Sequence, residues 1–545
     1  MSRRIEENLA DLDAKQAKVV RKIWNDLTSV KSNKFNMAII LGLVISSYFK
    51  TDVYTTIIDV IKEARKYPGQ PREHLLERLF IDLFIRKLKY PEDFSCLTFT
   101  SKYGYDLKDH QKTVVKYMMK NRGLIAAFDV GSGKTLTAIV TAECLRRQAL
   151  KDGQNKTIVI LTPVSLQGNF KKEMMNVGLN PESMEMKKYY KFYTFQEFAN
   201  RWREGKVNCK NTLLIVDEAH NLKKDYKGLF GTFGIAVDDT RAETVIACAK
   251  NAWKVLLLTA TPITNSPEDI VNLVAMVKGI EPEEVNFSEE IVKMGDNQPS
   301  IFDCTFSFYK PPQVDYPIRI DKLVEIEMTK DFYDAYMRYE QRRPKKSGGK
   351  EDKDNAFMSK LRTASNKIGN NPKIDFVKQI LDEDQKTLVY SQFKDSGIDI
   401  IKNILKNENK PYLEINGTIS KRRRDEIVKL VNTDQVKYLL ITKAGGEGLD
   451  LKGIRNVVLL EPSWNFATDE QVIGRAVRYK SHINLPVDEQ NVTVYRLILI
   501  KPKYTNDTDK KVSADLYMYK KSLEKEKINS EITDLLKSRS IGVLC

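Results

Sequence analysis

The sequence reads Leu-Ile-Ala-Ala-Phe at 124–128, then Gly131-Ser132-Gly133-Lys134-Thr135, then Leu-Thr-Ala-Ile-Val at 136–140. An apolar strand that turns through two glycines into a helix is typical of a phosphate-binding loop, because the glycines let the backbone wrap an anion and the helix N-terminus directs N–H groups at it. Lys134 is predicted to reach the β- and γ-phosphates, and Thr135 to place its hydroxyl on Mg²⁺. The usual first glycine of such a loop falls at Phe128, so the pattern is only partly met and a plain tight turn is the alternative.

A pair of carboxylates follows a second apolar run. Asn-Thr-Leu-Leu-Ile-Val at 211–216 predicts a buried strand, and Asp217-Glu218-Ala219-His220 comes directly after it. The carboxyl ends of parallel strands are where ligands bind in open α/β sheets. Asp217 is predicted to hold Mg²⁺ through water, and Glu218 to position or deprotonate the attacking water. One carboxylate there could merely cap a helix, but an acidic pair after a nucleotide loop predicts hydrolysis of a nucleoside triphosphate.

Composition limits the class of protein. A chain of 545 residues is too long for one core and suggests three or four domains. The net charge of +16 predicts a polyanionic partner. Six cysteines without a Cys-x-x-Cys pair argue against a disulfide framework or a zinc site and favour a reducing compartment. The start has no signal-peptide pattern, and the longest apolar run, 37–49, is too short to span a bilayer, so no membrane partner is expected.

The order of periodic segments predicts an α/β chain with two parallel-sheet lobes, an N-terminal helical region and a C-terminal helix. Strand runs alternate with helical stretches in two series, and only the first contains a phosphate loop, which suggests a nucleotide clamped between lobes. The aromatic, proline-rich segment 303–317 is expected to be extended and pinned to a lobe, and the charged stretch 342–354 to be a mobile loop. The expected divisions are 1–100 (helical), 101–282 (lobe 1), 283–366 (inter-lobe), 367–500 (lobe 2) and 501–545 (C-terminal helix).

Six further motifs fall in a recognisable succession. They are Lys108-Asp-His-Gln111, Leu161-Thr-Pro-Val-Ser-Leu-Gln-Gly-Asn-Phe170, Leu258-Thr-Ala-Thr-Pro262, Tyr390-Ser-Gln-Phe393, Thr442-Lys-Ala-Gly-Gly-Glu-Gly-Leu-Asp450 and Gln471-Val-Ile-Gly-Arg-Ala-Val-Arg478. With the Asp-Glu-Ala-His box, this succession resembles the superfamily 2 helicases, and TATPITNS with PSWNFATDEQVIGRAVR resembles their Swi/Snf-type DNA translocases. The resemblance covers about 101–500 and implies two RecA-like lobes that use ATP and Mg²⁺ and bind DNA.

The resemblance implies a role for each matched position. Gln111 would contact the base, Asp450 would approach the ribose, and Arg475 and Arg478 would act as arginine fingers from the opposite lobe. Being three apart, the two arginines are expected to share one side of a helix. Beyond the residues already named, the implied sets are Thr259, Thr261 and Gln471 for coupling hydrolysis to nucleic-acid grip, and Thr162, Ser165, Gln392 and Thr442 for contacts with the nucleic-acid backbone.

The chain departs from the Swi/Snf pattern in ways that favour a viral branch. It has Thr-Ala-Thr-Pro at 259–262 instead of Thr-Gly-Thr-Pro, Asp450 where many relatives have Asn, and Gly before Arg475 where Ala is usual. The stretch 475–496, SFYKPP at 307–312 and SADLYMYKKSLEKEK at 513–527 resemble the viral transcription ATPases, which include the poxvirus nucleoside triphosphatase I and the small early-transcription-factor subunit. That resemblance implies the host cytoplasm (viral factory) and the virion as locations.

Two features bear on partners. Ser420 followed by Lys-Arg-Arg-Arg at 421–424 predicts a capped helix whose first turn carries cations against the helix dipole. These cations either pair with nucleic-acid phosphates or are neutralised by Asp425 and Glu426, and both alternatives stay open. The helical region 1–100 is the expected docking surface for RNA polymerase or another transcription factor.

We therefore expect an ATP-dependent DNA translocase or helicase acting in the transcription of a large DNA virus. Three alternatives remain: an RNA helicase of the DEAH type, a structural or polymerase-docking virion subunit with a vestigial ATPase, and a cellular chromatin remodeler. The intact set Lys134, Asp217, Glu218, Arg475 and Arg478 disfavours the second, and the short length without accessory modules disfavours the third.

Overall fold

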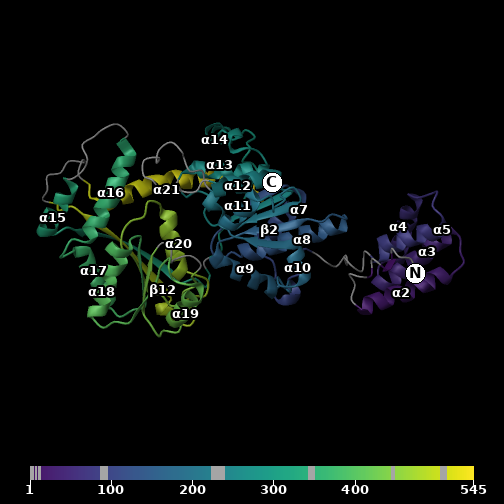
Figure 1. Ribbon diagram of the computed structural model, residues 1–545, viewed down its shortest axis with the longest axis horizontal. Helices are drawn as coiled ribbons and strands as arrows, with labels where there is room; N and C mark the ends of the chain where they lie inside the picture. Colours follow the sequence, from purple (N-terminus) through teal and green to yellow (C-terminus); the bar gives the residue numbers. More distant parts are fainter. Residues whose placement is uncertain are drawn as a thin grey trace. The chain divides into compact units, whose positions relative to one another are not determined.

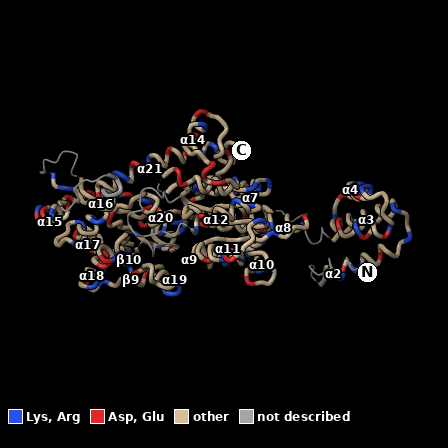
Figure 2. The backbone as a smooth tube through the Cα atoms, turned by 45° about the horizontal axis from the view of Figure 1, so that its top comes forward, with Lys and Arg blue, Asp and Glu red and all other residues tan. Residues whose placement is uncertain are grey.

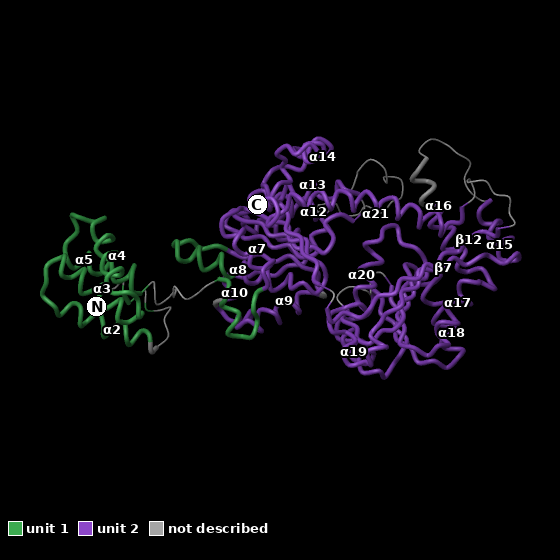
Figure 3. Tube along the Cα trace, turned by 180° about the vertical axis from the view of Figure 1, so that it is seen from behind, with its two compact units in different colours: residues 1–107, 143–156 green, residues 108–142, 157–545 purple. Residues whose placement is uncertain are grey.

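The computed structural model describes residues 5–6, 9, 14–85, 96–222, 240–264, 266–312, 314–341, 350–442, 449–503 and 512–545. Residues 342–349 of the charged stretch predicted to be a mobile loop, and residues 443–448 of the motif that ends at Asp450, lie outside these ranges. Residues 350–354 of the charged stretch form the start of a helix, so the prediction of a loop is wrong there. The chain forms two compact units, one of residues 1–107 with 143–156 and the other of 108–142 with 157–545 (Figure 3).

The first unit contains the N-terminal helices that the sequence predicts. They are α2 (Ala14–Ser29), α3 (Lys34–Phe49), α4 (Val53–Arg65), α5 (Arg72–Leu79) and the π-helical turn η1 (Phe80–Ile85). Asn33 and Asp52 cap α3 and α4 by accepting backbone N–H groups. Gly42 lets the two helices approach closely, since a Cβ there would lie 2.9 Å from the Ile57 backbone. The run 37–49 lies in α3, and no helix in the described ranges is long and apolar enough to cross a membrane.

The second unit contains two six-stranded sheets in which all the strand pairs are parallel (Figure 1). The first sheet has the order β3-β2-β4-β5-β1-β6. Its strands are β1 (Gly123–Phe128), β2 (Thr157–Leu161), β3 (Tyr190–Tyr193), β4 (Thr212–Val216), β5 (Lys254–Thr259) and β6 (Phe306–Tyr309). Its helices are α7 (Asp109–Lys120), α8 (Lys134–Lys151), α9 (Val164–Asn176), α10 (Met184–Tyr189), α11 (Phe195–Arg203), α12 (Thr240–Asn251), α13 (Ile270–Lys278) and α14 (Phe287–Gly295).

The second sheet has the order β7-β12-β11-β8-β10-β9. Its strands are β7 (Ile318–Glu327), β8 (Thr387–Ser391), β9 (Tyr412–Ile415), β10 (Tyr438–Thr442), β11 (Asn456–Leu459) and β12 (Asn491–Ile500). Its helices are α15 (Lys330–Glu340), α16 (Lys350–Asn366), α17 (Pro372–Asp382), α18 (Asp399–Asn407), α19 (Lys421–Asn432), α20 (Phe466–Ala476) and α21 (Ala514–Ser538). Short turns complete both lobes: η3 (Ala219–Leu222), η4 (Pro267–Asp269), η5 (Pro282–Glu284), η6 (Lys394–Ile398) and η8 (Val487–Glu489). The turn η2 (Ser101–Tyr103) belongs to the first unit.

The α/β class and the central strands are confirmed, and the misses lie at the sheet edges. Strands such as β4 and β10 are continuous apolar runs because helices cover both faces of a parallel sheet. The edge strands β3, β6, β7 and β9 are interrupted by aromatic or charged residues, and β7 is largely exposed. The segment 303–317, predicted to be extended, contributes β6, which pairs with β1.

The C-terminal helix α21 contacts elements of both lobes. It packs near its start against β12, α16 and α20, and it also contacts α14 and β6 (Figure 1). Leu536 belongs to the core of the first lobe. Arg539, just past the helix, donates to the Met294 carbonyl at 3.0 Å and pairs with Asp303 at 3.4 Å. This helix therefore braces one lobe against the other.

The expectation of unpaired cysteines is wrong in the structure. Cys209 is paired with Cys248, and Cys304 with Cys545, at Cα–Cα separations of 5.4 and 6.1 Å. The paired cysteines lie 39 and 241 residues apart in the sequence, so spacing within a motif could not reveal them. The second pair attaches the C-terminal residue beside the start of β6.

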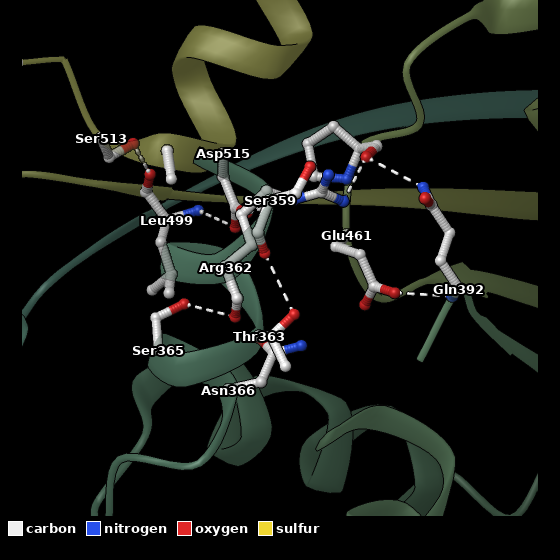
Figure 4. A network of polar contacts seen from close by, with 12 residues as sticks. Ser359, Arg362, Thr363, Ser365, Asn366, Gln392, Glu461, Leu499, Ser513 and Asp515 are labelled. Atoms are coloured by element: carbon white, nitrogen blue, oxygen red, sulfur yellow. Dashed lines mark hydrogen bonds and ion pairs between the residues drawn. The ribbon is translucent and has the colours of Figure 1, made fainter. Parts of the chain in front are cut away.

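A buried ionic cluster holds α21 in the second lobe (Figure 4). The Asp515 carboxylate accepts from Lys373 Nζ at 2.7 Å and from the Leu499 N–H at 3.2 Å, and it lies 3.5 Å from Arg362 Nε. The side chains of Arg362, Lys373 and Asp515 are at most 2% exposed. Arg362 also donates to the Pro462 carbonyl, which joins α16 to the segment after β11.

We expect Asp515→Ala to lower the free energy of unfolding by about 3–5 kcal/mol, because it leaves two buried cations without their carboxylate. Urea denaturation of the full chain, followed by circular dichroism, measures this loss. Asp534→Ala is the matched control on the same helix, since its pair with Lys537 is exposed and contributes about 0–1 kcal/mol. Equal midpoints for the two variants would contradict a stabilising role for the cluster.

Candidate nucleotide-hydrolysis site

The predicted phosphate loop has the strand–loop–helix form that such a loop needs. β1 ends at Phe128 and α8 begins at Lys134. Gly131 and Gly133 have φ values of +79° and +81°, a backbone region that favours glycine. The Ser132 hydroxyl donates to the Asp129 carbonyl at 2.6 Å and tightens the turn. The start of the 18-residue helix α8 therefore directs its N–H groups toward the space that the loop encloses.

Lys134 is half-buried and folds back over its own loop. Its Nζ donates to the carbonyls of Phe128 at 2.7 Å and Asp129 at 3.3 Å. Burial lowers the pKa of Lys134, the carboxylates of Glu218, Asp217 and Asp129 oppose that shift, and the positive charge of Arg475 adds to it. The ammonium group thus interacts electrostatically with both predicted carboxylates and with an arginine of the second lobe.

Asp217 lies at the end of β4 and is 7% exposed. Burial, with a smaller contribution from the neighbouring charge of Glu218, raises its pKa to about 6, although Lys134 and Thr162 oppose the shift. The Thr162 hydroxyl donates to Asp217 Oδ2 at 3.2 Å. A divalent cation beside this carboxylate would favour its charged form and reverse the shift.

A chain of polar contacts leads from Glu218 to the end of β5. Glu218 has a φ of +53°, unusual for a residue other than glycine, and its carboxylate lies 3.3 Å from His220 Nδ1. His220 Nδ1 lies 3.2 Å from Thr259 Oγ1, which accepts from the Thr261 N–H at 3.1 Å. The residues predicted for hydrolysis and for coupling are therefore in contact through His220, whose role sequence reasoning missed.

Side chains at the start of α7, which precedes β1, contact the phosphate loop and support it. Gln111, predicted to contact the base, donates from Nε2 to the Gly133 carbonyl at 3.3 Å and accepts from the Lys108 N–H at 2.9 Å. His110, which the sequence did not single out, stacks on Tyr309 of β6 with ring centroids 3.4 Å apart and lies 3.0 Å from the Ser132 carbonyl. β6 therefore supports the phosphate loop through His110.

The two predicted arginine fingers do not share a helix face, which corrects the expectation from their spacing. α20 ends at Ala476, and the cap residue Val477 has non-helical angles (φ −89°, ψ 87°), so Arg478 lies beyond the helix. Arg478 donates to the Leu449 carbonyl at 2.9 Å and pairs with the exposed carboxylate of Asp450 at 3.2 Å. Arg475 lies on α20, as does the half-buried Gln471.

The four residues predicted to contact nucleic acid differ in their positions, their burial and their hydrogen-bond partners. Thr162 is fully buried and faces Asp217, while Thr442 is 8% exposed at the end of β10. Gln392 donates to the Pro462 carbonyl and to the Ser463 hydroxyl, and its N–H donates to Glu461 at 2.7 Å (Figure 4). Ser165 lies in the first turn of α9.

At the basic start of α19, part of the charge is neutralised by a carboxylate of the same helix, as one of the two earlier alternatives expects, while the pairing with phosphates stays a prediction. Glu426 pairs with Arg422 at 3.4 Å and with Arg423 at 3.2 Å. Lys421 Nζ instead reaches across to Gly168 of α9 in the first lobe, at a position where a Cβ would collide with it. Lys and Arg are otherwise interspersed with Asp and Glu along the chain (Figure 2), so this turn is a local concentration of positive charge.

Comparison with known proteins assigns each lobe to a described family. Residues 104–264 match the family "Type III restriction enzyme, res subunit", and residues 372–480 match "Helicase conserved C-terminal domain". The chain is 31% identical to "Putative ATP-dependent RNA helicase L538" of Acanthamoeba polyphaga mimivirus, over 80% of this chain and 97% of the relative. It is 25% identical to "Termination factor NPH-I homolog" of African swine fever virus, over 77% of this chain and 76% of that protein.

Proposed function

The chain belongs to the superfamily 2 helicases, ATP-dependent enzymes that hydrolyse nucleotides and bind nucleic acid, and from this premise we propose that it is a DNA-stimulated translocase of viral transcription. The observation that supports the proposal is the geometry of the phosphate loop and its carboxylate. Lys134 opens α8 and folds over the loop, with Nζ 2.7 Å from the Phe128 carbonyl, and Asp217 follows β4 of the same sheet. The charge of Arg475, in the second lobe, acts on the pKa of Lys134, which fits a cleft between lobes that closes on a triphosphate.

The residues present fit ATP with Mg²⁺. Thr135 supplies a hydroxyl at the start of α8 and Asp217 a carboxylate at the end of β4, and Mg²⁺ in nucleotide sites is bound by one or two such oxygens together with phosphates and water. The metal ion supplies charge neutralisation on the phosphate oxygens when bound. Lys134 neutralises the β- and γ-phosphates, and Glu218 orients the attacking water and accepts its proton.

Coupling to nucleic acid runs through the contacts of Glu218. The carboxylate, His220, Thr259 and Thr261 form one continuous polar chain, so a change at the γ-phosphate alters the segment after β5. The phosphate backbone of the nucleic acid contacts Ser165, Gln392 and Thr442. Thr162 is buried and acts indirectly, through its hydrogen bond to Asp217. Arg475 and Arg478 complete the site when the lobes close, Gln471 lies beside them on α20, and Gln111 and Asp450 contact the base and the ribose.

The place in viral transcription is supported by a relative named a termination factor homolog, and by the resemblance of 307–312 and 513–527 to viral transcription ATPases. These two segments lie in or beside β6 and α21. The helical region 1–100 is then the docking surface for RNA polymerase or another transcription factor, in the host cytoplasm and the virion. A relative named an RNA helicase favours the alternative, in which RNA replaces DNA as the stimulating strand.

We expect DNA to stimulate ATP hydrolysis without sequence preference, and more strongly than RNA of equal length. An ATPase assay with no nucleic acid, single-stranded DNA, duplex DNA and RNA measures this order. Raising salt from about 50 to 200 mM should lower DNA affinity by roughly 10³–10⁵-fold if six to ten phosphates are neutralised. Stimulation by RNA alone would favour the RNA helicase, and salt-independent binding would contradict contact through phosphates.

A further inference from the structure

The segment between the two lobes carries a tyrosine that contacts both halves of the proposed site. We propose that Tyr316 is a positioning residue for hydrolysis, which holds the arginine-bearing segment 478–480 of the second lobe against the phosphate loop of the first. Tyr316 lies between β6, the edge strand beside β1, and β7, the edge strand beside β12. This role rests on the proposed nucleotide hydrolysis, and it concerns the connecting segment, outside the helicase-like motifs of the two lobes.

On the side of the first lobe, Tyr316 packs against the phosphate loop. A Cβ built on Gly131 would lie 2.9 Å from Tyr316 Oη, so the phenol occupies the space that a side chain at Gly131 would need. Burial raises the pKa of Tyr316, and the charge of Asp129 adds to that shift while Arg478 opposes it. The phenol therefore stays neutral at neutral pH beside the loop that is to receive phosphates.

On the side of the second lobe, the same short segment is attached directly after Arg478. The carbonyl of Asp315 accepts from the Lys480 N–H at 2.8 Å. The rings of Tyr316 and Tyr479 lie 6.0 Å apart between centroids at an angle of 54°, a spacing typical of aromatic pairs. Residues 315 and 316 thus hold the two residues that follow Arg478 by one backbone hydrogen bond and one ring contact.

This attachment matters because no helix fixes Arg478. α20 ends two residues earlier, and the guanidinium is held by the Leu449 carbonyl and the Asp450 carboxylate. The turn after Arg478 is closed within the second lobe by hydrogen bonds from Ser481 to the carbonyls of Ala476 and Arg478. The contacts of Tyr479 and Lys480 with the connecting segment attach this turn to the side of the phosphate loop. A displacement of about 1 Å in a group that acts on the reacting phosphate can cost roughly 100-fold in rate, so this clamp has a measurable effect.

The test is a double-mutant cycle in the full-length chain, using nucleic-acid-stimulated ATP hydrolysis and binding of a fluorescent ATP analogue. Tyr316→Ala is expected to lower kcat by roughly 10- to 100-fold and to change affinity for the analogue by less than about threefold. In the Arg478→Ala background the same substitution should lower kcat no further, because Tyr316 acts through Arg478. Tyr316→Phe keeps the ring contact with Tyr479 but removes the Oη beside Gly131, so its loss in kcat should be smaller than that of Tyr316→Ala.

Tyr479→Ala is a second route to the same contact, and its ring is 54% exposed, so folding does not depend on it. It is expected to lower kcat in the same direction, whereas Tyr339→Ala, an exposed tyrosine on α15, should not. Additive losses for Tyr316→Ala and Arg478→Ala, or a loss for Tyr316→Phe equal to that for Tyr316→Ala, would overturn the positioning role alone. A wild-type protein without nucleic-acid-stimulated ATPase activity would overturn the proposed function as well.

Discussion

Glu218→Gln will lower ATP turnover by roughly 10²–10⁴-fold while ATP still binds, because the substitution keeps the size of the side chain and removes the proton acceptor. The carboxylate follows Asp217 at the end of β4 and contacts His220, so glutamine fits the same space. Steady-state phosphate release measures turnover, and a fluorescent ATP analogue measures binding. If Glu218→Gln retained most of the wild-type rate, the assignment of the catalytic carboxylate would be wrong.

Lys134→Ala is expected to impair both ATP binding and turnover in the same assay, unlike Glu218→Gln. It removes the cation that neutralises the β- and γ-phosphates, so both the affinity for the analogue and the rate should fall. Lys151→Ala, at the far end of the same helix, is the matched control, because that side chain is exposed. Retained affinity in Lys134→Ala would show that the loop binds phosphate through its backbone alone.

Arg478→Ala will lower kcat steeply and leave the affinity for ATP nearly unchanged. Arg478 is paired with Asp450, and we expect its contact with phosphate to be made mainly when the lobes close in the transition state. Arginine fingers in GTPase systems contribute roughly 10³–10⁵ in rate, and Arg475→Ala is expected to behave in the same way. Single-turnover rates measured with saturating nucleic acid report this step directly.

Two control variants test whether the effect of Arg478→Ala is specific to the guanidinium group at that position. Arg478→Lys keeps the charge but not the planar fork of donors, so it should rescue little of the rate. Arg338→Ala removes an exposed arginine from α15 and should leave the rate unchanged. A single-turnover rate for Arg478→Ala equal to that of the wild type would exclude the finger role.

Local sequence patterns predicted those parts of the fold that are built from one continuous stretch of chain. The glycines at 131 and 133 and the helix after them could be predicted because a phosphate loop is built from one stretch of chain. The central strands could be predicted for the same reason, since burial on both faces requires a continuous apolar run. The edge strands β7 and β9 could not, because a half-exposed strand has no such run.

Predictions from the spacing of residues in the sequence were wrong where contacts between distant segments decided the structure. Arg475 and Arg478 have helical spacing, yet α20 ends between them, at Ala476. Cys304 and Cys545 have no spacing pattern, yet they are paired because α21 returns the chain to the first lobe. Asp515 reads as an ordinary acidic residue in the first turn of a helix, yet it is the buried partner of Lys373.

The sequence by itself therefore determined the chemistry, two α/β lobes and the superfamily, because each motif is a short stretch whose residue types are dictated by phosphate, metal ion and water. Only the tertiary structure decided which groups act on one another. His220 links Glu218 to Thr259, and the loop carrying Tyr316 joins the phosphate loop to the arginine segment. These contacts join residues far apart in the chain, and packing of the two sheets and their connecting segments is what brings them within reach.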